Sequence, residues 1–205
     1  MSSWKSLFDR VDVSGLWSYH LSTFYHYEKL QFYNKKEIPF PDKLLFGVAP
    51  ILLGIALCWS GLSFTKDYVN IVLTCLSIFI GLLFGLLTMV YSLVQENDKI
   101  DFKNVVVEDS KKVRAITDLT KHLFINIAFS IVLSVLALIF VLLTQLYPPK
   151  LISLLKELKY YFEIKSIYVY LTNGLSYILL IEFILVIMMI VRRFTVLFFN
   201  QFENK

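Results

Sequence analysis

The chain has little of what most soluble enzymes and metal-binding domains are built from. Its 205 residues include only two cysteines, three histidines and seven glycines, and charged residues make up 18% of the chain, against about 25% in an average soluble domain. Two cysteines exclude a disulfide-rich scaffold and a multi-cysteine metal site. No glycine-rich phosphate loop, HExxH helix or GxSxG turn is present. The sequence therefore predicts no catalytic residue, no metal site and no cofactor.

Long apolar stretches make up about half of the chain. Four of them cover residues 44–62, 68–95, 123–147 and 167–191, and together they contain one charged residue, Glu182. At about 1.5 Å of rise per residue, each stretch is long enough to cross a hydrocarbon core of about 30 Å. The sequence predicts an all-α integral membrane protein with four transmembrane helices and amphipathic helices at the membrane interface.

The distribution of Lys and Arg predicts the orientation. With both termini in the cytosol, fifteen of the twenty basic residues lie on the inner side, as the positive-inside rule requires. Arg192 and Arg193 then end the fourth span at the cytosolic interface, where such side chains anchor helices by reaching towards the head groups. The net charge of +4 fits attraction to the anionic lipids of an inner membrane, and no basic stripe of the kind that binds nucleic acid is seen.

The segments outside the spans have distinct compositions. Residues 1–43 form a cytosolic segment with ten aromatics in its first forty residues, Trp4 and Trp17 among them. We expect one or two helices here, the second over about residues 15–33, which either lie under the inner leaflet or dock a partner or a neighbouring copy. Residues 96–121 form a charged cytosolic loop, helical from about residue 110 and continuous with the third span. Residues 148–166 form an outer loop with a short amphipathic helix, and a cytosolic tail follows the fourth span.

The chain is organised as two hairpins, residues 44–95 and 122–205, and the first has a short connection at residues 63–67. Small residues recur on both helices of this hairpin, as they do where membrane helices approach closely. They include Gly54 in the first span and Ser77, Gly81 and Gly85 in the second. The second set is either a seam between copies of the chain or a packing surface against the first span. Pro50 lacks a backbone donor and is expected to kink the first span.

Glu182 is the polar residue that most needs an explanation. A charged side chain at mid-membrane costs about 2.5–3.5 kcal/mol on insertion scales. It either lines a pore or proton path, or bonds to polar groups of another helix such as Asn126, Ser130 or Thr74, or is simply tolerated inside the bundle. Its partner has to come from another helix or another copy.

A polar stripe runs down the third span and the helix before it. Its members are spaced four residues apart: Asp118, His122, Asn126, Ser130 and Ser134. Residues at this spacing stay close to one face of a helix. The stripe either lines a water path or donates hydrogen bonds to a neighbouring helix.

The layout resembles that of small multi-spanning membrane accessory proteins of prokaryotic antiviral systems, CRISPR-linked ones among them. The features that carry the resemblance are the cytosolic segment before Leu44, the tight turn at residues 63–67, the charged loop at residues 96–121 and the small size without a catalytic motif. The resemblance implies an accessory that senses or perturbs the membrane and is coupled to a cytosolic effector.

The expected function is therefore that of a non-enzymatic, homo-oligomeric membrane protein that binds a cytosolic protein through residues 1–40 and 96–121. Two alternatives stay open. The chain is a channel or transporter subunit that works alone, or it is a membrane scaffold without transport. Four helices of one copy pack into a bundle without a bore, so any pore requires several copies.

Overall fold

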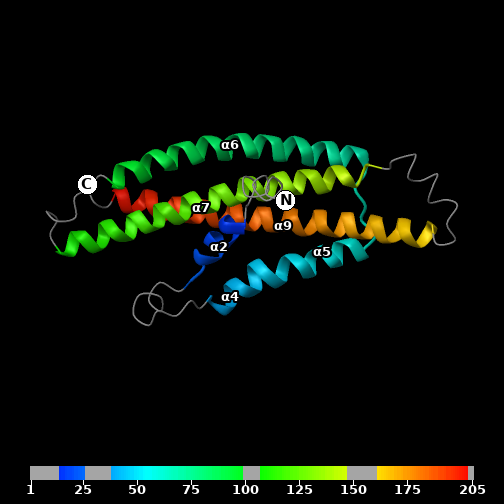
Figure 1. The fold of residues 1–205 in the computed structure, drawn as a ribbon, viewed down its shortest axis with the longest axis horizontal. Coiled ribbons are helices and arrows are strands. Elements are labelled where there is room, and N and C mark those ends of the chain that lie inside the picture. Colours follow the sequence, from blue (N-terminus) through cyan, green and yellow to red (C-terminus); the bar gives the residue numbers. More distant parts are fainter. Residues whose placement is uncertain (1–13, 26–37, 99–106, 147–160, 203–205) are drawn as a thin grey trace, which may run out of the picture. The chain divides into compact units, whose positions relative to one another are not determined.

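The computed structural model describes residues 14–25, 38–98, 107–146 and 161–202. Its elements are α2 (Ser14–Ser22), α4 (Phe40–Lys43), the π-helix η1 (Leu44–Val48), α5 (Ala49–Trp59), α6 (Lys66–Asp98), α7 (Val107–Leu143) and α9 (Tyr161–Phe202) (Figure 1). They form two compact units. The first contains Met1–Asp42, Leu86–Phe129 and Met189–Lys205, and the second contains Lys43–Gly85 and Ser130–Met188. Each of the three longest helices contributes residues to both units.

Four helical segments are long and apolar enough to cross a membrane: Phe40–Trp59, Lys66–Leu93, Ile116–Leu143 and Ser166–Phe199. Each overlaps one of the four predicted stretches, and the described residues contain no strand. The predicted class, an all-α integral membrane protein with four spans, is confirmed. Large apolar side chains such as Ile71, Leu82 and Phe84 are exposed along α6, which is the surface that a multi-pass protein presents to the lipid bilayer.

The first span begins four residues earlier than predicted and ends three residues earlier. It starts at Phe40 rather than at Leu44, because Pro41 fits the first turn of a helix, where no backbone donor is needed. It ends at Trp59 because the chain turns at Gly61, whose φ of 78° is in the left-handed region that glycine adopts without strain.

The expected irregularity at Pro50 takes the form of a π-helical turn just before it. Over Leu44–Val48 the backbone bonds reach one residue further than in an α-helix, and the Ala49 N–H donates to the Leu44 carbonyl. Pro50 has no N–H to give to the carbonyl four residues back, so the helix widens at this point and resumes as α5.

The third and fourth spans belong to longer helices than the apolar stretches alone. α7 is continuous from Val107 into the span, so the predicted helix through the charged loop is confirmed. α9 runs from Tyr161 to Phe202, and thus takes in residues 161–166 of the predicted outer loop and most of the tail. The rest of the predicted outer helix lies outside the described residues.

An aromatic core holds the second unit together where α5 turns into α6. Phe64, Val69, Val141 and Tyr177 are buried against one another, and the rings of Phe64 and Tyr177 lie 4.6 Å apart. The Gln145 side-chain amide donates to the Phe64 carbonyl at 2.8 Å. These contacts fix the turn against the end of α7 and the first half of α9.

At Gly54 the backbone of α5 lies close to α9, and no other glycine that the structure describes has such close neighbours. A Cβ atom placed on Gly54 would clash with the Ile178 side chain and lie 3.2 Å from the Ile178 backbone nitrogen. Gly54 therefore acts as the predicted small packing residue, but its neighbour is the fourth span.

We expect Gly54→Ala to destabilise the protein by about 1–3 kcal/mol, because the backbone of α9 has to move to admit the methyl group. Gly47→Ala is the matched control, since no atom lies within 4 Å of the added Cβ there. The free energy of unfolding in mixed micelles measures both. Equal stability of the two variants would show that α5 and α9 are not packed through Gly54.

Candidate functional site

The N-terminal helix α2 packs through its polar side. Along α2 and the turn that follows it, His20, Thr23 and Phe24 are buried, whereas Trp17 and Tyr19 are exposed. The structure confirms a helix in the first part of the predicted range 15–33, over Ser14–Ser22. The helix ends at Ser22, because the Thr23 N–H and hydroxyl both donate to the His20 carbonyl. Residues 26–33 of the prediction lie outside the described residues.

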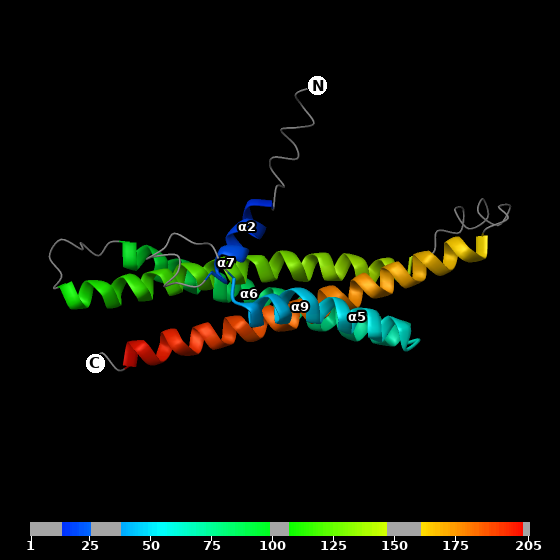
Figure 2. The same cartoon turned by 90° about the horizontal axis from the view of Figure 1, so that it is seen from below.

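His20 connects α2 to α7. Its Nδ1 lies 2.9 Å from Oδ1 of Asn126, so the neutral tautomer with its hydrogen on Nδ1 donates this bond. The ring stacks on Phe129 with 3.8 Å between centroids and 10° between planes. Figures 1 and 2 show α2 beside α7 from two directions.

Thr23 connects the same turn to α9. The Thr23 hydroxyl lies 3.2 Å from Asn126 Oδ1, and the Arg193 Nη2 group donates to the Thr23 carbonyl at 2.8 Å. His20, Thr23, Asn126 and Arg193 all lie in the first unit, and we call them the α2 cluster.

The two neighbouring arginines have different surroundings. Arg192 is exposed, whereas Arg193 is partly buried and bonds to Thr23 in the turn after α2. The predicted anchoring of both arginines at the membrane interface stays a prediction. Asp42 is the acidic residue that interacts favourably with Arg193 through its charge.

Two donors of the α2 cluster are not used. Asn126 Nδ2 and Arg193 Nη1 are buried without a hydrogen-bond partner. A buried donor without an acceptor costs about 1–3 kcal/mol, and more when it is charged. The α2 cluster therefore holds α2 in place with part of its bonding capacity unused.

Burial keeps His20 neutral in this position. It lowers the pKa of His20 from 6.5 to about 4, and the positive charge of Arg193 acts in the same direction, whereas the bond to Asn126 opposes the change. The other groups of the α2 cluster provide no acid, and within the described chain no group of three or more His, Cys, Asp or Glu residues could hold a metal ion. The geometry is that of a polar contact between helices.

The structure does not bring Glu182 together with the residues predicted to pair with it. Asn126 bonds to α2, Thr74 donates to Asn70 of its own helix, and Ser130 Oγ is buried without a partner. Glu182 is half-buried on α9, and its carboxylate has no hydrogen bond within the described residues. A partner from another copy stays a prediction.

The GxxxG pair of α6 faces open space. No atom lies within 4 Å of a Cβ placed on Gly81 or on Gly85, and Ser77 is exposed with its hydroxyl bonded to Leu73 of the same helix. These residues do not pack against the first span, and the seam between copies stays a prediction.

Of the four residues of the α2 cluster, Asn126 and Arg193 could be singled out from the sequence. Asn126 was recognised as a member of the polar stripe, and it bonds to α2 rather than to another span. His20 and Thr23 were missed because the aromatics dominate their segment. The available signal was their spacing of three residues, which places two polar side chains on one side of a short helix. Trp4 lies outside the described residues, and Trp17 contacts Phe129 edge to face at 5.3 Å.

Comparisons of the chain with models of protein families, with curated proteins and with solved structures found no match. The evidence about function therefore comes from the sequence and geometry of this chain.

We expect acid to weaken the docking of α2. Undocked His20 takes up a proton near pH 6.5 and docked His20 only near pH 4, so the docked state is fully stabilised above pH 6.5. It loses up to about 3 kcal/mol as the pH falls towards 4. Trp17 fluorescence reports the docking in a chain with Trp4→Phe and Trp59→Phe.

The control for this titration is His20→Gln, which keeps a donor for Asn126 and has no group that titrates. Its Trp17 signal should stay constant between pH 6.5 and 4. The same transition in both chains would show that another group controls the contact.

Proposed function

We propose that this chain is a non-enzymatic, multi-pass inner-membrane protein with cytosolic termini that transmits the binding of a cytosolic partner to its membrane helices. The observation that carries this proposal is the buried α2 cluster. It joins a segment that precedes the first span to the helices that form the third and fourth spans. A protein that binds the N-terminal segment acts directly on those helices.

The energetics of the α2 cluster support a switch between two states. Removing α2 leaves the Asn126 amide and the Arg193 guanidinium without the bonds they make to it, in addition to the two donors already unpaired. Unpaired polar groups of this kind are costly in apolar surroundings, so the parts of α7 and α9 that carry them have to rearrange or bind water. This rearrangement is the step by which a cytosolic event alters the membrane.

The orientation rests on the positive-inside distribution of charge. It places the aromatic segment at residues 1–43 and the charged loop at residues 96–121 on the same side of the membrane. Trp17 and Tyr19 are exposed on α2, and exposed aromatics are the residues that most often anchor a protein partner. The resemblance in layout to accessory proteins of antiviral systems suggests that the partner is an effector of such a system.

Substitutions of Arg193 and Arg192 test whether docking of α2 is coupled to the membrane helices. In Arg193→Gln the charged bond to Thr23 is lost, worth about 1.5–3 kcal/mol, so docking of α2 weakens by about ten- to hundredfold. Hydrogen exchange of amides 14–25 should speed up, and release of a dye from vesicles that contain the protein should change.

Arg192→Gln removes the same charge from an exposed position and should alter neither measurement. If dye release is the same in the two variants, the α2 cluster does not control the membrane helices. A third result would favour the stand-alone channel. In that case the wild-type protein alone passes ions, Glu182→Gln reduces the flux, and the two arginine variants behave alike.

We further propose that copies of the chain assemble through the α6 surface around Gly81 and Gly85. What supports this is the empty space beside both glycines, together with the low burial of this span, of whose most apolar part only 11% is buried. Glycines spaced four apart allow two membrane helices to approach closely.

The assembly is tested by combining Gly81→Leu with Gly85→Leu. Light scattering of the detergent-purified wild type should give the mass of more than one chain, and the double variant should give that of one chain, because the leucines hold the helices apart. Gly47→Leu, at another glycine without near neighbours, should keep the wild-type mass. A monomeric wild type, or an unchanged mass in the double variant, would contradict the proposed seam.

A further inference from the structure

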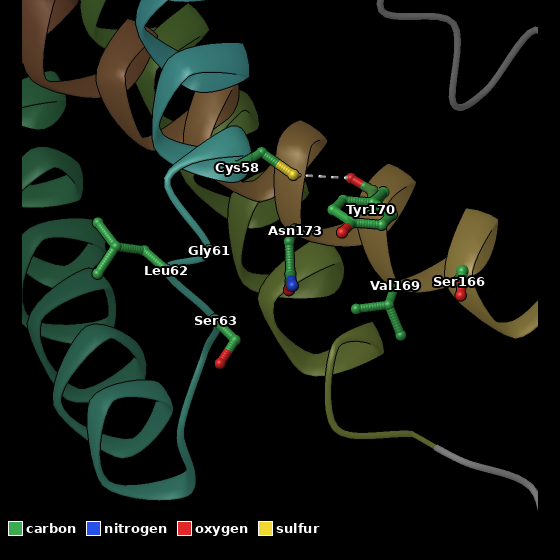
Figure 3. A pocket seen from close by; sticks show the side chains of 8 residues that line it. All are labelled: Cys58, Gly61, Leu62, Ser63, Ser166, Val169, Tyr170 and Asn173. Atoms are coloured by element: carbon green, nitrogen blue, oxygen red, sulfur yellow. Dashed lines mark hydrogen bonds between the residues drawn. The ribbon is translucent and has the colours of Figure 1, made fainter.

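A small cavity opens beside the turn between α5 and α6. It has a volume of about 360 Å³ and lies between the end of α5, the turn itself and the first turns of α9. Its lining includes Cys58, Leu62, Ser63, Ser166, Tyr170 and Asn173. Figure 3 shows these side chains around the opening, with the Cys58 thiol donating to the Tyr170 carbonyl at 3.5 Å. All of them belong to the second unit, so the cavity is separate from the α2 cluster.

Asn173 is the feature that distinguishes this cavity from an ordinary surface hollow. Its side chain is 7% exposed and extends into the space between Val169 and the Gly61–Ser63 turn (Figure 3). No hydrogen bond is made by its amide within the part of the chain that the structure describes. Among the described residues, the buried side-chain atoms without a partner belong to Asn126, Ser130 and Arg193, so the Asn173 amide is accessible from the cavity. A ligand that offers both a donor and an acceptor can therefore bond to it.

The lining determines the chemistry of such a ligand. None of the eight lining residues is charged, so an ionic ligand would lose its hydration without gaining a counter-charge. The amide of Asn173 and the hydroxyls of Ser63 and Ser166 both donate and accept hydrogen bonds, as the hydroxyl groups of a ligand do. Leu62 and Val169 supply apolar surface for a carbon skeleton. The volume is at the lower end of the range for small-molecule sites.

We propose that this cavity binds a small, uncharged, hydroxyl-bearing molecule through Asn173, either a free polyol or the glycerol end of an uncharged lipid. The site goes beyond the proposed coupling function and does not depend on it. Asn173 forms the central hydrogen bonds, and the two serines hold the outer end of the ligand.

Alkylation of Cys58 measures occupancy. In a Cys75→Ser chain, Cys58 is the remaining thiol, and a bound molecule shields it from maleimide. The probes are glycerol, added to the protein in detergent micelles, and diacylglycerol in phosphatidylcholine nanodiscs. Slower alkylation with glycerol identifies a free polyol, and slower alkylation with diacylglycerol alone identifies a lipid. Either result supports the site.

Variants separate binding from solvent effects. Asn173→Leu keeps the branched shape of the side chain and removes the amide, and should weaken the apparent affinity for the protecting probe about tenfold. Ser63→Ala, at an exposed position on the turn, should weaken it in the same direction without disturbing a buried residue. Asn70→Leu, at an exposed asparagine on α6 outside the lining, should leave protection unchanged.

A Cys58→Ser chain, which reports on Cys75, corrects for the effect of the probes on the reagent. Protection by neither probe would overturn the proposal. Equal protection in wild type, Asn173→Leu and Ser63→Ala would do the same.

Discussion

A polar group inside an apolar helix has to find a partner, and this requirement shapes most of what is specific to the chain. In lipid the backbone satisfies itself within each helix, so the only groups left to pair are a few side chains and the helix ends. Asn126 reaches α2, Gln145 reaches the Phe64 carbonyl, and the Tyr168 hydroxyl donates to the Leu143 carbonyl at the end of α7. Each of these bonds joins segments that are distant in sequence. Apolar packing brings helices together in general, and these bonds decide which residues meet.

The same requirement explains where the helices are irregular. Pro50 has no backbone N–H to donate to the carbonyl four residues before it. A π-helical turn at Leu44–Val48 accommodates this loss. Gly61 allows α5 to stop, and the Thr65 hydroxyl accepts a bond from the Tyr68 N–H at the start of α6. The turn between them is therefore determined by its own residues. Three of its residues, Gly61, Leu62 and Ser63, also line the Asn173 cavity.

The four spans could be predicted because hydrophobic length is a local property that one segment carries by itself. The ends of the spans were less predictable, since the helix of the first span continues through Pro41 and Asp42 and those of the third and fourth continue through charged sequence, where hydropathy gives no signal. The partners of polar residues were harder still. Asn126 has His20 as its partner across 106 positions of sequence, and the pattern of either segment alone contains nothing about the other. Gly54 was recognised as a packing residue, but the identity of its neighbour depends on which helices lie side by side.

The pair Arg192 and Arg193 shows why position relative to a helix face matters more than residue type. Both have the same charge and reach, and they follow one another at the same end of α9. Consecutive residues on a helix point about 100° apart, so one faces outward and the other faces α2. The inward arginine is held by a backbone carbonyl and by the charge of Asp42 without a direct ion pair to a buried acid among the described residues. A guanidinium bound in this way keeps an unsatisfied N–H group and gains from any acceptor that approaches. A contact of that kind holds α2 in place, and the proposed coupling depends on it.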